Sequence, residues 1–296
     1  MATDSAPATP PVWTVAALLR WTTDFLSKKG IDAPALEARL LLAHVLECKP
    51  IEVLVRSFDE PTDAERAKFR ELITRRVQGW PVAYLVGSKD FFLLRFEVTP
   101  AVLIPRPDTE TLVQKALELL KSQPTARVLD IGTGCGCIAI SLAHQCPGIE
   151  VVAVDVSPDA LEVARRNAKA HGVEGRVQFL HGDLIAPVPA EALFDLIVSN
   201  PPYISPSEIA TLAPDVKDHE PRVALDGGPD GLAFYRRLAA EAGKFLKPGG
   251  ALLLEIGYTQ NNAVRAILSA RPEWKLGESV RDLGGRWRVV AAQRAG

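Results

Sequence analysis

Long apolar runs, cysteine clusters and histidine pairs are all missing from this chain of 296 residues. No apolar stretch approaches the roughly 20 residues that a bilayer requires, so we expect no membrane segment. Four cysteines are too few for a disulfide framework in a chain of this length, which predicts a reducing compartment. The five histidines are scattered, and the Cys135-x-Cys137 pair has no second ligand pair at zinc-site spacing, so we assign no metal.

A strong charge of one sign is missing as well. The chain has 34 Lys and Arg against 36 Asp and Glu, a net charge of −2 and a pI near 6.2. A protein whose main affinity came from neutralising phosphates would be basic, so we expect no direct, stable nucleic-acid binding. A local basic patch around Arg75, Arg76 and Lys89 is still compatible with this balance.

The first residues also lack the basic and apolar regions of a signal peptide or transit peptide. Residues 1–11 are polar and rich in proline, which predicts a disordered tail. Together with the cysteine usage, this predicts a cytoplasmic protein.

Length and patterning predict two domains. Residues 12–82 carry apolar side chains at helical spacing, with a capping-box pattern at Thr62 and Glu65, and form a predicted helical bundle. We interpret this bundle as a cap or recognition domain beside an enzyme core. Residues 83–104 are aromatic and β-branched with breaks at Gly87 and Pro100, which predicts a linking β-hairpin.

Residues 105–296 alternate between strand and helix patterns. Short apolar runs typical of buried parallel strands are followed by helical segments, and the chain finishes with a predicted hairpin around Asp282-Leu283-Gly284-Gly285. The pattern predicts an α/β fold with a doubly wound, mostly parallel, seven-stranded sheet that ends in antiparallel strands. Its predicted strands are 128–131, 151–154, 177–180, 194–198, 252–256, 275–280 and 287–292. The same pattern predicts helices over residues 158–170 and 230–246 and a turn at Pro248-Gly249-Gly250.

A glycine loop follows the first of these strands and opens a helix. Its residues are Gly132, Thr133, Gly134, Cys135 and Gly136. Glycines at such a junction allow a tight turn and a close approach of backbone to ligand. Asp155 comes about twenty residues later at the tip of the second strand, where it can accept hydrogen bonds from two ribose hydroxyls.

The pattern G-x-G-x-G disfavours a dinucleotide and leaves S-adenosylmethionine as the expected cofactor. Asp183, followed by Leu184, is placed to contact the adenine amine, or else only begins the next turn. Asp130 either faces the cofactor's sulfonium or caps the glycine turn.

The stretch Asn200-Pro201-Pro202-Tyr203 follows the apolar run 194–198. Ligands of open α/β sheets lie beyond the carboxyl ends of strands, so we expect this stretch at the active site. The Asn200 side-chain oxygen and the Pro201 carbonyl can accept the two N–H groups of a planar amide or amine, and Tyr203 can stack on it. The structural alternative is a proline turn capped by an asparagine.

These stretches, with Ile104-Pro105-Arg106-Pro107-Asp108-Thr109-Glu110, resemble the release factor glutamine N5-methyltransferases of the HemK type. The similarity extends over nearly the whole chain, including Glu220-Pro221-Arg222 and Asp230-Gly231-Leu232. The segment at 104–110 is either a rigid linker or a lid over a ligand, and Asp108 stands where such enzymes more often have Glu.

The resemblance implies the class I S-adenosylmethionine-dependent methyltransferase fold. It implies methyl transfer to the glutamine of the Gly-Gly-Gln motif of peptide chain release factors, with a helical N-terminal domain that docks the substrate. Asn200, Pro201, Pro202 and Tyr203 would hold the substrate amide, and Asn200 would also lie against the cofactor.

Two other functions stay open at this point. A nucleic-acid adenine N6-methyltransferase could use the same four-residue pocket for a flipped base. A non-catalytic, cofactor-binding regulatory protein would need only the glycine loop and Asp155.

Overall fold

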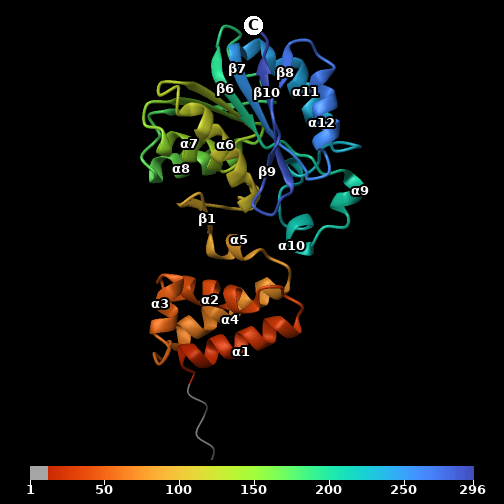
Figure 1. The fold of residues 1–296 in the computed structure, drawn as a ribbon. Coiled ribbons are helices and arrows are strands. Elements are labelled where there is room, and N and C mark those ends of the chain that lie inside the picture. The colour runs from red at the N-terminus through yellow and green to blue at the C-terminus, as the bar shows by residue number, and fades with distance from the viewer. Residues whose placement is uncertain (1–12) are drawn as a thin grey trace, which may run out of the picture. The chain divides into compact units, whose positions relative to one another are not determined.

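The computed structural model describes residues 13–296, so the tail predicted over residues 1–11 lies outside the described range. The described chain folds as two compact units, one that ends at Val86 and one that spans Gly87–Gly296, and each is described by itself (Figure 1). Every helix within residues 13–296 is too short or too polar to cross a lipid bilayer.

The first unit is entirely helical in its described part. Its helices are α1 (Val15–Lys28), α2 (Pro34–Val45), α3 (Pro50–Val55), α4 (Asp63–Val77) and α5 (Val82–Val86). The predicted capping box is confirmed, because the Thr62 side chain accepts from the Glu65 amide while the Glu65 carboxylate accepts from the Thr62 amide.

The core of this unit comes from the apolar faces of α1, α2 and α4. Leu26, Leu41 and Phe69 are almost fully buried, and a side chain of this size contributes about 1.5–3 kcal/mol when it leaves water. At the edge of the core, the Arg76 guanidinium forms an ion pair with Glu37 at 2.7 Å.

The second unit begins with a β-hairpin that is shorter than predicted. Strands β1 (Ser88–Phe91) and β2 (Leu94–Glu97) pair antiparallel, and Phe92 and Leu93 take the turn with φ values of 46° and 65°. The prediction of extended structure from residue 83 is wrong, because residues 82–86 form α5.

The large sheet of the second unit has the order β5-β4-β3-β6-β7-β10-β8, with β9 also paired to β10. Strands β3 to β7 are parallel neighbours, and β10 runs antiparallel to β7, β8 and β9. The strands are β3 (Arg127–Ile131), β4 (Glu150–Asp155), β5 (Val177–His181), β6 (Phe194–Ser199), β7 (Leu246–Glu255), β8 (Trp274–Leu276), β9 (Val280–Arg281) and β10 (Trp287–Arg294).

The sheet departs from the predicted seven strands at two places. The strand predicted over residues 275–280 is divided into β8 and β9, which makes eight strands in all. The turn predicted at Pro248-Gly249-Gly250 lies inside β7, because β7 pairs with β6 from Leu246 onward through an irregularity at Phe194 and Leu196.

Helices cover both faces of this sheet (Figure 1). Figure 1 shows α6 (Glu110–Leu120), α7 (Cys137–Gln145) and α8 (Pro158–Ala170) on one face, and α11 (Ala233–Glu241) and α12 (Asn261–Ser269) on the other. The helix predicted over residues 230–246 is shorter than expected, since it is limited to α11 and the 3₁₀ turn η3 (Ala242–Phe245). Short turns that sequence reasoning did not predict are η1 (Pro107–Thr109), α9 (Pro206–Ile209), α10 (Pro214–Lys217) and η2 (Arg222–Ala224).

Candidate active site

The glycine loop turns directly after β3. Gly132, Gly134 and Gly136 have φ values of 76°, 57° and 85°, a region that side-chain-bearing residues rarely adopt. The amides of Gly132 and Thr133 both donate to the Val154 carbonyl, at 2.8 and 3.0 Å, which ties the loop to the end of β4. A Cβ on Gly136 would lie 2.7 Å from the end of the Ile140 side chain, and the φ of 85° would strain any residue that carries one, so glycine is favoured where helix α7 begins.

Asp130 holds this loop through hydrogen bonds. Its side chain is fully buried, and its Oδ2 accepts from the Thr133 hydroxyl at 2.7 Å and from the Ala139 amide at 3.2 Å. Burial raises the pKa of Asp130 to about 7. Of its two predicted roles, capping the glycine turn is the one that these contacts match.

Asp155 stands at the tip of β4 beside the loop. Its Oδ2 accepts from the Gly134 amide at 2.8 Å and its Oδ1 from the Ser157 amide at 2.9 Å. The carboxylate holds these loop amides and can also accept a hydrogen bond from a ligand hydroxyl. Burial raises the pKa of Asp155, while hydrogen bonds from the Ser157, Gly134 and Val156 amides oppose the shift.

A cleft opens at this edge of the sheet. Among the predicted site residues, the cleft is lined by Gly132, Gly134, Asp155, Asp183, Leu184, Asn200 and Pro202. Thr133, Cys135 and Gly136 are buried in the loop and do not line the cleft, so contact between them and a cofactor stays a prediction. Lining residues that sequence reasoning missed include Ala101, Val102, Leu103, Val156, Ser157 and Phe234.

Two of the lining residues sit beyond β5. Asp183 is about half exposed and forms an ion pair with Arg237 of α11 at 2.7 Å. Leu184 has a φ of 50°, an uncommon conformation for leucine, and its side chain is nearly buried against the apolar core. The cleft thus has an apolar wall with one paired carboxylate at its rim.

The stretch from Asn200 to Tyr203 follows β6, and of its four residues Asn200 and Pro202 line the cleft while Pro201 and Tyr203 do not. It is fixed at its start by the Ser199 hydroxyl, which donates to the Ile131 carbonyl at 2.7 Å, and at its end by Gln260, whose Nε2 donates to the Tyr203 carbonyl at 2.9 Å. A Cβ on Gly227 would lie 2.7 Å from the Tyr203 Cα. The stretch is therefore held in one conformation from three sides.

Tyr203 keeps its proton at any ordinary pH. Burial, followed by the nearby Glu255 carboxylate, raises the pKa of Tyr203 to about 12. Its phenol is therefore neutral, and its ring packs against the apolar core of the second unit.

The segment from Ile104 to Glu110 is held in place by charge pairs within the second unit. Arg106 forms an ion pair with the buried Glu220, whose other oxygen accepts from the Ile104 amide. Asp108 forms an ion pair with Arg288 of β10 at 2.7 Å. The Asn200 Nδ2 donates to the Thr109 hydroxyl at 3.2 Å, so this segment also contacts the predicted catalytic asparagine.

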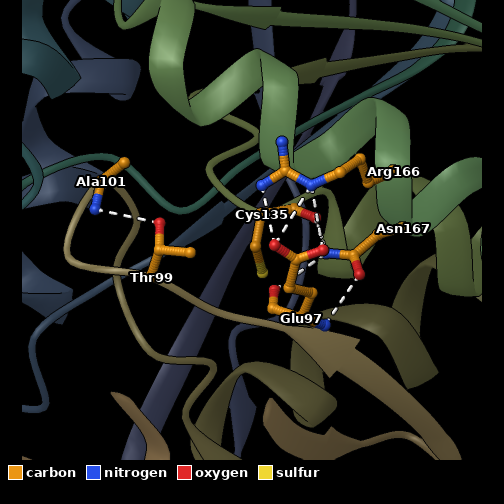
Figure 2. Close-up of polar contacts among 6 residues, drawn as sticks. All are labelled: Glu97, Thr99, Ala101, Cys135, Arg166 and Asn167. Atoms are coloured by element: carbon orange, nitrogen blue, oxygen red, sulfur yellow. Dashed lines mark hydrogen bonds and ion pairs between the residues drawn. The ribbon is translucent and has the colours of Figure 1, made fainter. Parts of the chain in front are cut away.

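Asn167 of α8 joins the hairpin to the glycine loop (Figure 2). Its Oδ1 accepts from the Glu97 amide at 2.7 Å, and its Nδ2 donates to the carbonyls of Glu97 and Cys135 at 3.0 and 2.9 Å. Arg166 adds an exposed ion pair to the Glu97 carboxylate at 2.7 Å. These contacts hold the segment that follows β2 next to the glycine loop. This segment leads to Ala101, which lines the cleft.

Sequence reasoning missed Glu255 and Arg288. Glu255 ends β7, next to β6, and is buried with only 1% of its surface exposed. The argument that selected Asn200 applies equally to Glu255, because it directly follows the buried run Leu252-Leu253-Leu254 at the carboxyl end of a parallel strand. Arg288 gives no comparable sequence signal.

The residues present fit S-adenosylmethionine. The three glycines leave the loop backbone accessible, and no heavy atom lies within 4 Å of where a Cβ on Gly134 would be. The carboxylate of Asp155 offers acceptors for two ribose hydroxyls, and Leu184, Val156 and Phe234 give apolar surface for a base. This donor set suits a nucleoside with no phosphate.

Comparison with known proteins identifies both units. Residues 17–87 match the PrmC N-terminal domain, and residues 109–215 match the methyltransferase small domain. The release factor glutamine methyltransferase of Geobacter sulfurreducens is 44% identical over 88% of this chain and 90% of its own length. That of Rhodopirellula baltica is 41% identical over 96% of this chain and 97% of its own.

Among solved structures, a methyltransferase from Pyrococcus furiosus matches with a TM-score of 0.50 and 21% identity, over 75% of this chain and 98% of that one. This match supports the fold only, and it agrees with the predicted methyltransferase architecture.

Proposed function

This chain belongs to the release factor glutamine methyltransferase family, and we propose that Asn200, Pro201, Pro202 and Tyr203 hold the substrate amide for methylation. The protein is an S-adenosylmethionine-dependent enzyme that methylates the glutamine side-chain nitrogen of release factors. We further propose that this glutamine is the one in the Gly-Gly-Gln motif, as the sequence resemblance implies.

One observation carries the assignment of the site. Asn200 lines the same cleft as the glycine loop and Asp155, at the carboxyl end of the strand next to β3. A substrate amide held by Asn200 would therefore lie beside a cofactor held by Asp155.

The chemistry depends on the orientation of a weak nucleophile. S-adenosylmethionine supplies an electrophilic methyl group on a sulfonium sulfur. An amide nitrogen reacts poorly because its lone pair is delocalised into the carbonyl. The Asn200 Oδ1 and the Pro201 carbonyl accept the two N–H groups of the substrate, which turns the lone pair toward the methyl group and weakens the delocalisation.

The remaining residues exclude water and hold the substrate flat. The Tyr203 ring stacks on the planar amide, and its neutral phenol adds no charge near the reacting nitrogen. The reaction is an in-line displacement without a covalent intermediate, and the methylated nitrogen loses one proton to water. The two hydrogen bonds to the substrate amide and the stacking of Tyr203 favour the transition state over the bound substrate.

We also propose that the helical unit docks the release factor. Its support is a group of exposed apolar side chains on and after α3, among which Val55 is 82% and Phe58 is 91% exposed. Exposed apolar surface of this kind is typical of protein interaction sites. If this unit docks the factor, an intact release factor has a lower KM than a free peptide that carries the same glutamine.

Mass spectrometry of a release factor tests the proposed site directly. After incubation with the protein and S-adenosylmethionine, we expect one added methyl group on the Gly-Gly-Gln glutamine, and none with Asn200→Ala. Binding of the cofactor to Asn200→Ala, measured by calorimetry, controls for a misfolded variant. Near-normal turnover in Asn200→Ala would contradict the assigned role. An unmodified peptide with cofactor bound would favour a nucleic-acid amine as the substrate instead.

A further inference from the structure

Glu255 is a buried carboxyl group that the mechanism above does not use. It ends β7, and the preceding residue, Leu254, pairs with Ser199 immediately before Asn200. Within residues 13–296, its Oε2 has no hydrogen-bond partner. A buried carboxyl group with an unpaired oxygen is costly, so its place beside the predicted catalytic asparagine requires an explanation.

Thr109 links this carboxyl group to Asn200. The Thr109 side chain is 2% exposed, and hydrogen bonding from it is one of the effects that lower the pKa of the Glu255 carboxyl group against its burial. The same hydroxyl accepts from the Asn200 Nδ2 at 3.2 Å. One hydroxyl therefore lies between the carboxyl group and the amide.

The protonation of Glu255 decides which end of the Asn200 amide faces Thr109. An ionised carboxylate only accepts hydrogen bonds, so the single Thr109 proton must point to Glu255. The hydroxyl can then offer only lone pairs to Asn200, and only the NH₂ end of the amide fits there. The Asn200 Oδ1 is left on the opposite side, where it can accept an N–H from the substrate.

We propose that Glu255 and Thr109 are positioning residues that fix the Asn200 amide with its oxygen presented to the substrate, an inference that rests on the proposed role of Asn200. When Glu255 is protonated it can donate to Thr109, whose own proton is then free to point at Asn200. The amide then loses its preference for one orientation, and the wrong orientation presents NH₂ to the N–H groups of the substrate.

The environment of Glu255 places this change near neutral pH. Burial raises the pKa of Glu255 to about 7, against the opposing effects of the Thr109 hydrogen bond and the positive charge of Arg288. The titratable and charged groups that act on Glu255 or feel its charge are Arg106, Asp108, Cys137, Tyr203, Tyr235 and Arg288. Of these, Tyr235 of α11 also fixes the Glu255 backbone, because its phenol donates to the Glu255 carbonyl at 2.9 Å.

Steady-state kinetics on three variants test the relay. Thr109→Val removes the hydroxyl at nearly constant shape, Thr109→Ser restores it, and Glu255→Gln removes the charge. We expect Thr109→Val to lower kcat at pH 8 by about 10- to 100-fold, which is the effect of losing one hydrogen bond to a charged group. The KM for release factor and the Kd for S-adenosylmethionine should change less than about threefold. Thr109→Ser should return to within about threefold of the unaltered protein.

The pH profile and the double variant separate this relay from a direct role of Glu255 as proton acceptor. Acidification through pH 7 should lower kcat in the unaltered protein. In Glu255→Gln, kcat should change much less over the same pH range. Since both residues act through one hydroxyl, Thr109→Val with Glu255→Gln should be no slower than the slower of the two single variants. Losses that multiply in the double variant would overturn the proposal, as would normal kcat in Thr109→Val. Glu118→Gln, an exposed change on α6, is the matched control.

Nuclear magnetic resonance gives a readout that needs no turnover. In the protein without substrate, the side-chain NH₂ signals of Asn200 should shift with pH near 7, and this shift should vanish in Glu255→Gln. If the unaltered protein methylates no release factor, the proposed function fails while this spectral test still decides the relay. Asn200 side-chain signals that do not shift between about pH 5.5 and 8.5 would contradict the proposed relay.

Discussion

Arg106 and Glu220 form an ion pair at 2.6 Å although 114 residues separate them in the chain. Each belongs to one of the stretches that carry the family resemblance, so the pair joins two motifs that sequence inspection left apart. It gives Arg106 a role that a rigid linker would not require. The segment with Thr109 is thereby held against the end of the sheet.

Loss of this pair should lower both stability and turnover. The Glu220 side chain is 1% exposed, so Arg106→Ala leaves a buried carboxyl group without its partner. We expect a loss of about 2–3 kcal/mol in the free energy of unfolding at pH 8, below the usual range for fully buried pairs because Arg106 is partly exposed. Burial raises the pKa of Glu220 above its ordinary value of 4.5, so the loss should grow only as pH rises through that raised pKa and Glu220 ionises.

Urea denaturation at pH 5 and pH 8 measures this effect. Arg166→Ala, which breaks the exposed pair with Glu97 seen in Figure 2, should cost less than about 1 kcal/mol. Equal losses in the two variants would show that burial of Glu220 contributes nothing.

Asp155 should dominate the affinity for the cofactor. Asp155→Ala removes both ribose acceptors, and hydrogen bonds to a charged group contribute about 1.5–3 kcal/mol. We expect the Kd for S-adenosylmethionine to rise by about 100-fold in calorimetry. Asp183→Ala is the comparison, because its carboxylate is half exposed and already paired with Arg237, and it should cost less than about tenfold. Similar losses for the two would contradict the ribose assignment.

Buried Asp130 should make the unfolding free energy fall as pH rises. The pKa of Asp130 in the folded protein is about 7 against an ordinary value of 3.8, so its stabilising contribution is complete below pH 4 and is lost as pH rises through 7. Asp130→Asn should reduce the difference in unfolding free energy between pH 5 and pH 8 by about 2 kcal/mol. Guanidinium denaturation across this range gives the slopes. An unchanged slope in Asp130→Asn would place the titration elsewhere.

Gly227 should be intolerant of any side chain. In Gly227→Ala the new Cβ would lie 2.7 Å from the Tyr203 Cα and 2.8 Å from the Pro202 carbonyl oxygen. Overpacking of this kind costs about 1–3 kcal/mol, and here it displaces the substrate-binding stretch. We therefore expect kcat to fall at least about tenfold in steady-state methylation. Gly175→Ala, with no heavy atom within 4 Å of its Cβ, should leave kcat and melting temperature nearly unchanged.

The parts of the fold that the sequence predicted are those with a strong local pattern. Helix α8 spans Pro158–Ala170 as predicted, because a proline at its start, the Ser157 cap and one apolar face all agree. The sequence predicts extended structure from residue 83 because Tyr84 and Val86 favour strands locally, but these residues lie in helix α5, where Tyr84 and Leu85 are buried. Pro248 and Gly249 suggested a turn, and pairing with β6 overrides that preference.

The residues of the site show the same contrast between those that have a local sequence signal and those that have none. Asp155 and Asn200 follow buried strands, so the rule for open sheets placed them correctly beside one cleft. The contacts among Thr109, Glu255 and Arg288 depend on segments that meet only in the folded sheet, and no local pattern predicts such pairs. The sequence does not choose between the two roles of Asp130, because a single carboxylate after a strand suits both capping of the glycine turn and contact with a sulfonium.

The sheet order has a consequence for synthesis. Strand β10 is made after β8 and β9 yet inserts between β7 and β8, and it brings Arg288 to the site. A nascent chain that has emerged only as far as β9 therefore exposes the bare edge of β7, a surface that can pair with another chain. Until β10 has emerged, the chain lacks Arg288 at the site and presents an unpaired strand edge, so we expect chains that end before β10 to be inactive and to aggregate.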